Sequence, residues 1–439
     1  MINYVLEKTL VTIGRPCRLA VALLMGAVGL TNLAHGAEVI VTNAASITAA
    51  ALAAQPGDVL VMQDGVWPDA DILFATYGTE AQPVTLRAQT LGRVHLTGQS
   101  RLRMAGSYLV VDGLIFTNGY RTSGDVIAFR DSSSSVAFNS KLINCAVIDY
   151  NPPNLTNDTK WVSIYGASNR VESCHFRGKA NVGATLVVWV SELPDPNNPN
   201  YHVITRNYFG PRPFLTAASN GGETIRVGTS DYSMNISRTT VEDNFFERSN
   251  GDVEIISSKS CENIYRRNTF WECEGALTLR HGNNCTVEGN YFFGNLQTNT
   301  GGVRIMGENH RVFNNYFENL RGSSSRAPLV FMQGLPNSPL NGYFQVSNAT
   351  VVFNTFVNCN NTFVVGLSGT VGGVPTSLPP KDSTVANNIV LQTSGRIVDL
   401  RLGPENFTWT SNLFASTTLG ITNPGASDCP SAATSRPCR

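Results

Sequence analysis

The sequence predicts an all-β protein, a single-domain right-handed parallel β-helix. Two observations lead to this prediction: a short phrase recurs along the chain, and the repeating region lacks the 3.6-residue apolar period of a helix. The phrase consists of two or three β-forming residues, then Asn, a variable residue, and an aromatic or aliphatic one. Its asparagines are Asn207, Asn244, Asn268, Asn290, Asn315, Asn354, Asn388 and Asn412.

The spacing of the repeats separates a solenoid from other all-β folds. Four of the seven intervals between successive asparagines are 22–25 residues, and the other three are 34–39. Propeller blades need about 40–45 residues, and a sandwich does not repeat one phrase so often. Equivalent positions of successive coils stack about 4.8 Å apart, so the repeated Asn can hydrogen-bond from coil to coil and the repeated Phe can stack inside. The sequence therefore predicts a solenoid, with insertions as loops after Cys174, Asn207, Asn315 and Asn354.

The N-terminus has the pattern of an export signal. Arg15 and Arg18 precede the apolar stretch 19–30, which is followed by small residues up to Ala37. This order is typical of a secretory signal, so residues 1–36 are predicted to be a signal peptide. About 12 apolar residues are fewer than the ~20 of a membrane-spanning helix. We therefore expect a secreted or periplasmic protein with no membrane partner after cleavage.

The rest of the chain divides into a β-helix domain, residues 37–414, and a C-terminal tail, residues 415–439, rich in Thr, Ser, Pro and Ala. The Ala-rich segment 46–54 predicts a short helix that caps the first coils. The eight cysteines that follow the signal form no C-x-x-C pair, which argues against a zinc site. Cys429 and Cys438 could form a small staple, and buried free thiols are at least as plausible for the others.

Charge is sparse and balanced. The 439 residues include 32 Lys+Arg and 32 Asp+Glu, and charged residues make up 15%, well below the roughly 25% of an average domain. This balance gives no general argument for a nucleic-acid partner. An anionic ligand must therefore be held by a local cluster of charges.

Such a cluster lies in the most regular repeats. Asp252 and Glu254 are two positions apart, so both carboxylates are expected on one face of a strand. Two neighbouring carboxylates in a chain this poor in charge are costly unless a cation neutralises them. A ligand set that contains only oxygen atoms suits Ca²⁺, and Asn220 could supply a third ligand oxygen. Lys259 and Arg280 are 21 residues apart and should lie on neighbouring coils. The alternative is an ordinary solvated face, where the two acids pair with these two cations.

Five further residues near this cluster are candidates for substrate binding. Glu223 and Arg226 are either a cross-strand pair or substrate contacts, and His281 stands beside the arginine of the cluster. Arg304 and His310 follow about one coil later and are expected either to extend a cationic groove for a polyanion or to lie on the solenoid surface.

These segments resemble polysaccharide lyase family 6, which contains alginate lyases and chondroitinase B. The similarity covers most of the chain after the signal and is carried by residues 254–260 (EIISSKS), 268–270 (NTF), 277–282 (LTLRHG), 220–226 (NGGETIR), 83–88 (PVTLRA) and 109–114 (LVVDGL). The resemblance implies a parallel β-helix with Lys259 as catalytic base and Arg280 as catalytic acid. It also implies that Asp252, Glu254 and Asn220 bind calcium, although Asp252 stands where the family has Glu.

The residue types suit a β-elimination. A base removes the C5 proton of a uronate and the bond to the C4 oxygen breaks, so Lys259 must be neutral to act. Arg280 keeps its charge and is better described as stabilising the leaving oxygen. Ca²⁺ would neutralise the sugar carboxylate as negative charge develops. A hydrolase would need two facing carboxylates, which would leave Lys259 and Arg280 without a role.

We therefore expect an exported lyase that cleaves alginate, an anionic uronic-acid polysaccharide, with Ca²⁺ as cofactor. The first alternative is a lyase of the chondroitinase B kind, with the same chemistry on dermatan sulfate. The second is a β-helical carbohydrate-binding protein without turnover. The complete set of lysine, arginine and acids argues against it, because binding alone has no need of a base.

Overall fold

The computed structural model describes residues 36–190, 199–215, 221–391, 394–416 and 418–420. The described residues belong to one compact unit that begins at Gly36. The predicted signal peptide, apart from its last residue, and most of the predicted tail lie outside the described residues. Asn220, Cys429 and Cys438 also lie outside them, so the calcium-ligand prediction for the first and the staple predicted for the other two stay predictions.

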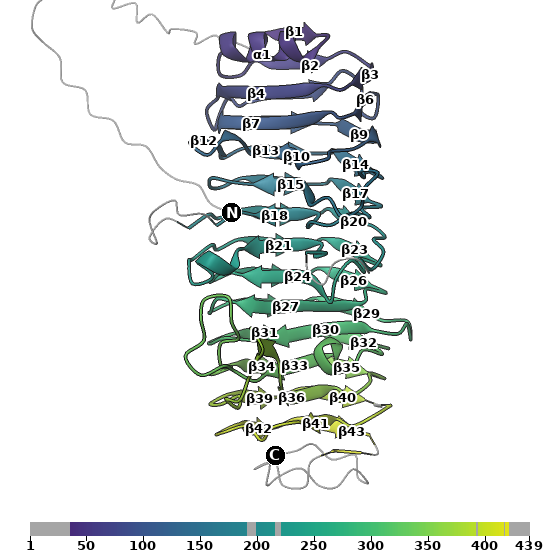
Figure 1. The fold of residues 1–439 in the computed structure, drawn as a ribbon, viewed down its shortest axis with the longest axis vertical. Coiled ribbons are helices and arrows are strands. Elements are labelled where there is room, and N and C mark those ends of the chain that lie inside the picture. The colour runs from purple at the N-terminus through teal and green to yellow at the C-terminus, as the bar shows by residue number, and fades with distance from the viewer. Residues whose placement is uncertain (1–35, 191–198, 216–220, 392–393, 417, 421–439) are drawn as a thin grey trace, which may run out of the picture. The chain divides into compact units, whose positions relative to one another are not determined.

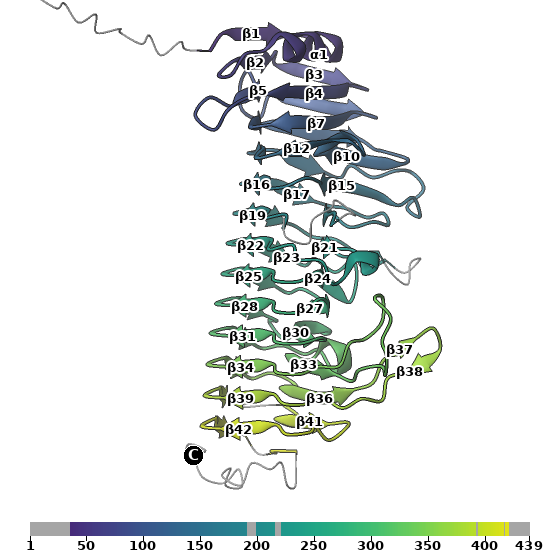
Figure 2. The same ribbon diagram turned by 90° about the vertical axis from the view of Figure 1, so that its left-hand side faces the viewer.

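The described chain winds into three long sheets, and successive coils add one parallel strand to each (Figures 1 and 2). The predicted parallel β-helix is confirmed. The first sheet runs β1 (Glu38–Val41), β2 (Val59–Met62), β5 (Val84–Ala88), β8 (Leu109–Asp112), β13 (Lys141–Ile143), β16 (Arg170–Glu172), β19 (Val203–Thr205), β22 (Thr240–Glu242), β25 (Ile264–Arg266), β28 (Thr286–Glu288), β31 (Arg311–Phe313), β34 (Thr350–Val352), β39 (Thr384–Ala386) and β42 (Thr408–Thr410).

The second sheet carries the candidate site. It runs β11 (Arg130–Ser132), β12 (Ser135–Phe138), β7 (Arg101–Ser107), β10 (Gly124–Ala128), β15 (Thr159–Ile164), β18 (Leu186–Val188), β21 (Ile225–Gly228), β24 (Glu254–Lys259), β27 (Gly275–His281), β30 (Thr300–Ile305), β33 (Leu329–Met332), β36 (Phe363–Leu367) and β41 (Val398–Leu400), with β4 (Asp71–Tyr77) beside β7. Within it, β11 and β12 form an antiparallel pair.

The third sheet closes the coil. It runs β3 (Gly65–Pro68), β6 (Val94–Gly98), β9 (Leu114–Gly119), β14 (Ala146–Ile148), β17 (His175–Arg177), β20 (Tyr208–Phe209), β23 (Phe245–Glu247), β26 (Thr269–Trp271), β29 (Tyr291–Phe293), β32 (Tyr316–Glu318), β35 (Thr355–Val357), β40 (Ile389–Leu391) and β43 (Leu413–Ala415). The remaining elements are the hairpin β37 (Thr370–Val371) and β38 (Val374–Pro375), the helix α1 (Ala44–Ala53), and the 3₁₀ turns η1 (Ser230–Tyr232) and η2 (Ser324–Arg326).

The repeated asparagines form a continuous buried ladder, as their spacing predicted. From Asn244 onward, each Oδ1 accepts from the backbone N–H and the Nδ2 of the asparagine one coil before it; between Asn268 and Asn290 both distances are 3.0 Å. The same pair of bonds recurs from Asn207 to Asn412. Because every amide both donates and accepts, the bend between the first and third sheets has no unpaired side-chain amide along this ladder.

A column of stacked phenylalanines lies inside the coil beside the ladder, and this too matches the prediction. Neighbouring rings are nearly parallel, with centroids 4.5–5.3 Å apart; the members are Phe176, Phe209, Phe246, Phe270, Phe292, Phe317 and Phe356. Offset stacking of this kind adds about 0.5–1.5 kcal/mol per pair beyond the burial of the rings.

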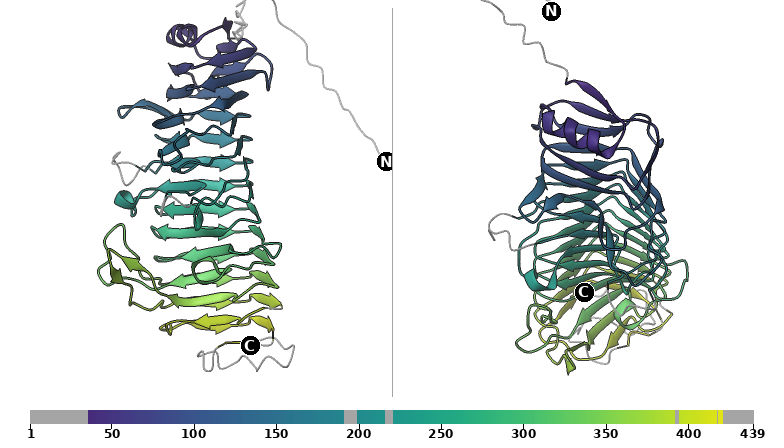
Figure 3. Two further views of the ribbon diagram at one scale, coloured as in Figure 1. Left: turned by 45° about the vertical axis from the view of Figure 1, so that its right-hand side comes forward. Right: turned by 45° about the horizontal axis from the view of Figure 1, so that its top comes forward.

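The N-terminal end of the solenoid is covered by α1, drawn in purple in Figure 3. The helix begins after Asn43, whose Oδ1 accepts from the N–H of Ser46 at 2.8 Å, and Ile47 and Ala51 face the core. The predicted capping helix is thereby confirmed. No helix of the described residues is long and apolar enough to span a membrane. The described cysteines are buried and unpaired: Cys145, Cys174, Cys261, Cys273, Cys285 and Cys359.

Candidate active site

Lys259 and Arg280 lie on adjacent strands of the second sheet, as predicted. β24 and β27 pair with Ser258 opposite Leu279, and a register shift then puts Lys259 opposite His281. Side chains alternate between the two faces of a strand. Since Leu279 belongs to the core, Lys259 and Arg280 leave the sheet on its outer face. We call β24 and β27 the catalytic strands.

Lys259 is held by a buried acid on the preceding coil. Its Nζ lies 3.4 Å from Oε1 of Glu223, which is 1% exposed. The partner of Glu223 is therefore the lysine and not Arg226, so the predicted cross-strand pair with Arg226 is wrong, whereas the alternative of a substrate contact stays a prediction. The close approach of the two coils requires Gly228: its φ is +93°, and a Cβ there would lie 2.3 Å from the carbonyl oxygen of Lys259.

Arg280 is fixed by a loop that arrives more than 60 residues later in the chain. Its Cζ lies 4.2 Å from the ring centroid of Tyr343, and its Nη1 donates to the carbonyl oxygen of Gly342 at 2.8 Å. Burial lowers the pKa of Arg280, and the charge of Glu254 opposes that effect. The guanidinium thus stays charged and has a fixed orientation.

Glu254 is the centre of a buried ion-pair network. It pairs with Arg304, its Oε1 lies 3.9 Å from Nε of Arg280, and it accepts a hydrogen bond from Ser257. Burial by itself raises the pKa of Glu254, but Arg304, Lys259 and Arg280 outweigh it, and the pKa falls below its ordinary value. Glu254 is therefore ionised at neutral pH.

Asp252 lies in the bend before β24, because the strand begins only at Glu254. The prediction that both acids sit on one strand is wrong for this residue. Its Oδ2 accepts from the N–H of Gly222 at 3.2 Å. Burial, followed by the charges of Glu223 and Glu254, raises the pKa of Asp252. The charges of Glu223 and Glu254 thus add to burial in opposing the ionisation of Asp252.

The carboxylates of Glu223, Asp252 and Glu254 are oxygen ligands, the kind that calcium binds. Among the described residues, no group of three or more His, Cys, Asp or Glu side chains converges as a formed metal site. Ion pairs with Lys259 and Arg304 hold Glu223 and Glu254, while the buried Oε2 of Glu223 has no hydrogen-bond partner in the described part of the chain. Carboxylate oxygens, one of them unsatisfied, are the donor set that a hard divalent cation takes.

Three other predicted substrate-binding residues are also buried. Arg304 is 5% exposed and reaches the site only through Glu254, so it does not extend an open groove. His281 is 1% exposed, with its Nε2 3.3 Å from Oγ of Ser230, and burial together with Arg280 keeps it neutral by lowering its pKa. His310 is wrong as a substrate contact, because both its ring nitrogens are hydrogen-bonded to backbone within the core.

Two residues of the site escaped the sequence interpretation. Tyr343 lies in the insertion between β33 and β34. Arg212 lies in the insertion after Asn207; it is buried and donates to the carbonyl oxygen of Glu223 at 2.8 Å. Burial lowers the pKa of Arg212 to about 10. Neither residue follows the repeat period, and the period was the signal that located the others.

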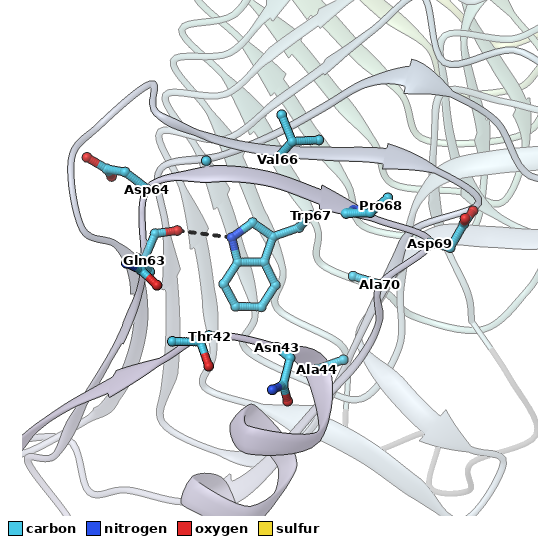
Figure 4. A pocket seen from close by; sticks show the side chains of 11 residues that line it. Thr42, Asn43, Ala44, Gln63, Asp64, Val66, Trp67, Pro68, Asp69 and Ala70 are labelled. Atoms are coloured by element: carbon cyan, nitrogen blue, oxygen red, sulfur yellow. Dashed lines mark hydrogen bonds between the residues drawn. The ribbon is translucent and has the colours of Figure 1, made fainter.

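A separate cavity of about 380 Å³ lies at the N-terminal coils (Figure 4). Trp67 forms one wall, and its Nε1 donates to the carbonyl oxygen of Gln63 at 3.0 Å. The acids at its rim, Asp64 and Asp69, accept backbone N–H groups and stabilise turns. The cavity adjoins β3 of the third sheet, whereas the catalytic pair lies on the second. It offers acids and no base, so it is not the candidate active site.

Known proteins share the fold and much of the sequence. The family model described as chondroitinase B matches residues 41–417. The solved polysaccharide lyase family 6 (PL6) alginate lyase AlyGC is 38% identical, with a TM-score of 0.77 over 86% of this chain and 54% of its own. This chain belongs to polysaccharide lyase family 6. It spans about half the length of AlyGC.

Two further structures of the family match over most of their length. A mannuronic acid-specific family 6 lyase from the human gut microbiota is 30% identical, with a TM-score of 0.77 over 90% of this chain and 88% of its own. The family 6 lyase Pedsa3628 from Pseudopedobacter saltans is 28% identical, with a TM-score of 0.73 over 91% of this chain and 96% of its own. No curated protein sequence matches.

Proposed function

We propose that this family 6 protein is a lyase that cleaves alginate by β-elimination. The observation that carries the proposal is the placement of Lys259 and Arg280 on adjacent strands and one outer face, beside a buried cluster of carboxylates. The alginate assignment is supported by two relatives at least 30% identical, which are described as an alginate lyase and as a mannuronic acid-specific lyase.

In the proposed reaction Lys259 is the base. Its neutral Nζ takes the proton from C5 of a uronate, the C5–H electron pair forms the C4=C5 double bond, and the bond from C4 to the glycosidic oxygen breaks. Arg280 donates hydrogen bonds to that oxygen as it acquires negative charge, and a proton from water completes the leaving alcohol. The stacking of Arg280 on Tyr343 holds the donor in place before substrate arrives.

We propose that Ca²⁺ is the cofactor, held by Asp252, Glu254 and Asn220 as the sequence implies, with Glu223 as a further ligand. When bound, it would neutralise the carboxylate of the sugar and so make the C5 proton more acidic. The proposal is supported by the unsatisfied oxygen of Glu223 and by the burial of Asp252, which together with the charges of Glu223 and Glu254 raises the pKa of Asp252. Glu223 also positions the base, because its Oε1 lies 3.4 Å from Nζ of Lys259.

A dermatan sulfate lyase remains the second candidate, because the matching family model bears the name of chondroitinase B. The chemistry at Lys259 and Arg280 would be the same, and the two candidates differ only in the sugar that the outer face accepts. A binding protein without turnover is the third candidate and leaves Lys259 without a role.

The test is the ultraviolet absorbance of new C4=C5 double bonds. Polymannuronate, polyguluronate, mixed alginate and dermatan sulfate are offered separately, each with and without a calcium chelator. Signal on an alginate that chelation abolishes supports both the lyase and the metal, and signal only on dermatan sulfate favours the second candidate. Lys259→Ala should lose turnover by at least about 10³-fold while still binding oligosaccharide. Lys141→Ala, at an exposed lysine of the first sheet, is the matched control.

We further propose that the protein is exported, on the strength of the N-terminal pattern of residues 1–36. Mass spectrometry of the protein recovered from the periplasm and from the medium tests this. A mature N-terminus at or next to Ala37 is expected, and an intact Met1 in both fractions would refute the assignment.

A further inference from the structure

The cavity at the N-terminal coils is built around the indole ring of Trp67. Figure 4 shows the ring reaching from β3 towards Thr42 and Asn43, which precede α1. Its only donor, Nε1, is already bound to the carbonyl oxygen of Gln63 at 3.0 Å, and this bond fixes the plane of the ring. Trp67 belongs to the core and is only 7% exposed. The indole is therefore a rigid aromatic wall rather than a mobile surface group.

Uncharged polar side chains line the cavity beside this wall. Thr42, Asn43 and Gln63 are all exposed residues of the lining. The Oδ1 of Asn43 accepts from the N–H of Ser46 and caps α1, which leaves its Nδ2 free. Within the part of the chain that the structure describes, the hydroxyl of Thr42 and the side-chain amide of Gln63 also have no hydrogen-bond partner. The cavity thus offers both donors and acceptors to a ligand.

Two acids lie at the ends of the cavity and restrict the charge of a ligand. Asp64 precedes β3 and Asp69 follows it, and Figure 4 shows them on opposite sides of the indole. Because the four-residue strand separates them by roughly 15 Å, they cannot share one metal ion. Among the described residues, no Lys, Arg or His lines the cavity. An anion such as a uronate is therefore repelled from it.

The chemistry of the lining selects one class of ligand. An apolar molecule would leave the amide and hydroxyl groups without partners, at a cost in affinity. An uncharged sugar ring fits both parts of the cavity, because its hydroxyls pair with these groups while its C–H face packs on the indole. The volume of about 380 Å³ lies at the small end of the range for ligand cavities and suits about one or two sugar rings. We propose that this cavity is a binding site for an uncharged saccharide, such as the end of a neutral polysaccharide.

This saccharide site is separate from the catalytic strands. It adjoins β3 of the third sheet, whereas Lys259 and Arg280 leave the outer face of the second. β3 is also six steps along the third sheet from β23, the strand that directly precedes β24 in the chain, a distance of roughly 30 Å (Figure 1). A neutral polysaccharide bound here would hold the protein and leave the catalytic strands uncovered. The proposal does not depend on which polymer the catalytic strands act on.

The test is calorimetry of the wild-type protein with three uncharged disaccharides: cellobiose, β-1,4-mannobiose and maltose. At least one should bind with one-to-one stoichiometry. Asn43→Ser removes the free amide but keeps an oxygen that can cap α1, and Gln63→Ala removes the second amide. Each should weaken binding about two- to tenfold, the effect of one lost hydrogen bond. The matched control is Gln297→Ala, at an exposed glutamine after β29, where a change of less than about twofold is expected.

A competition experiment separates this site from the catalytic strands. The disaccharide that binds is titrated again into Lys259→Ala protein saturated with a mannuronate octamer, and its affinity should stay within about twofold. Displacement by the octamer would place the disaccharide on the second sheet and overturn the proposal. Absence of binding by all three disaccharides at about 20 mM, or equal affinities in Asn43→Ser, Gln63→Ala and Gln297→Ala, would also overturn it. None of these results bears on the lyase, which the absorbance assay tests by itself.

Discussion

Replacing one asparagine in the middle of the buried ladder should destabilise the whole solenoid. Asn290 is fully buried: its Oδ1 accepts from the N–H and the Nδ2 of Asn268, each at 3.0 Å, and its Nδ2 donates to Asn315 at 2.9 Å and to the carbonyl of Tyr265 at 3.0 Å. Asn290→Ala removes the acceptor of two buried donors of Asn268. At about 1–3 kcal/mol for each unsatisfied donor, the expected loss is roughly 4 kcal/mol.

Urea unfolding followed by circular dichroism measures this loss through the midpoint and the slope. The control is Asn341→Ala, at an exposed asparagine, where a change below about 0.5 kcal/mol is expected. If the two variants unfold within about 1 kcal/mol of each other, the ladder does not stabilise the coil as argued. A second, earlier transition in Asn290→Ala alone would instead show that the coils on its two sides unfold separately.

Two further predictions concern the site and the dependence of stability on pH. Gly228→Ala should place a methyl group against the carbonyl of Lys259 and so lower both turnover and the free energy of unfolding. The control is Gly124→Ala, where φ is also positive but the space around the Cα is open, so that only the cost of backbone strain is expected. Equal losses of stability in the two variants would refute the close approach at Gly228. Burial lowers the pKa of His202 to about 3 and that of His310 to about 4, so both are neutral in the folded state, and the unfolded chain binds more protons below about pH 6.5. Stability should therefore fall by roughly 2 kcal/mol per histidine from pH 7 to pH 5, and urea midpoints that do not change over this range would contradict it.

The sequence determined the fold because the solenoid is a repeated local structure. Each coil places the same residue types at the same bend, so the period of Asn290 and its equivalents specifies the ladder and the phenylalanine column together. The same period brought Lys259 and Arg280 to adjacent strands, since 21 residues is about one coil. The family resemblance agreed with both inferences.

The partners of the charged side chains were decided only by the tertiary structure. The period predicts which coil a residue occupies but not which neighbour it meets, because insertions and register shifts do not repeat. The shift after Ser258 sets Lys259 opposite His281, and β24 starts too late to include Asp252.

Loops far along the chain complete the site. The loop with Tyr343 fixes Arg280, and Arg304 turns to Glu254 rather than to an open groove. His310 follows Arg304 by only six residues but is buried in a bend of the core, where both its ring nitrogens have backbone hydrogen-bond partners. Repetition along the chain thus fixed the scaffold, whereas packing between coils and loops fixed the electrostatics of the site.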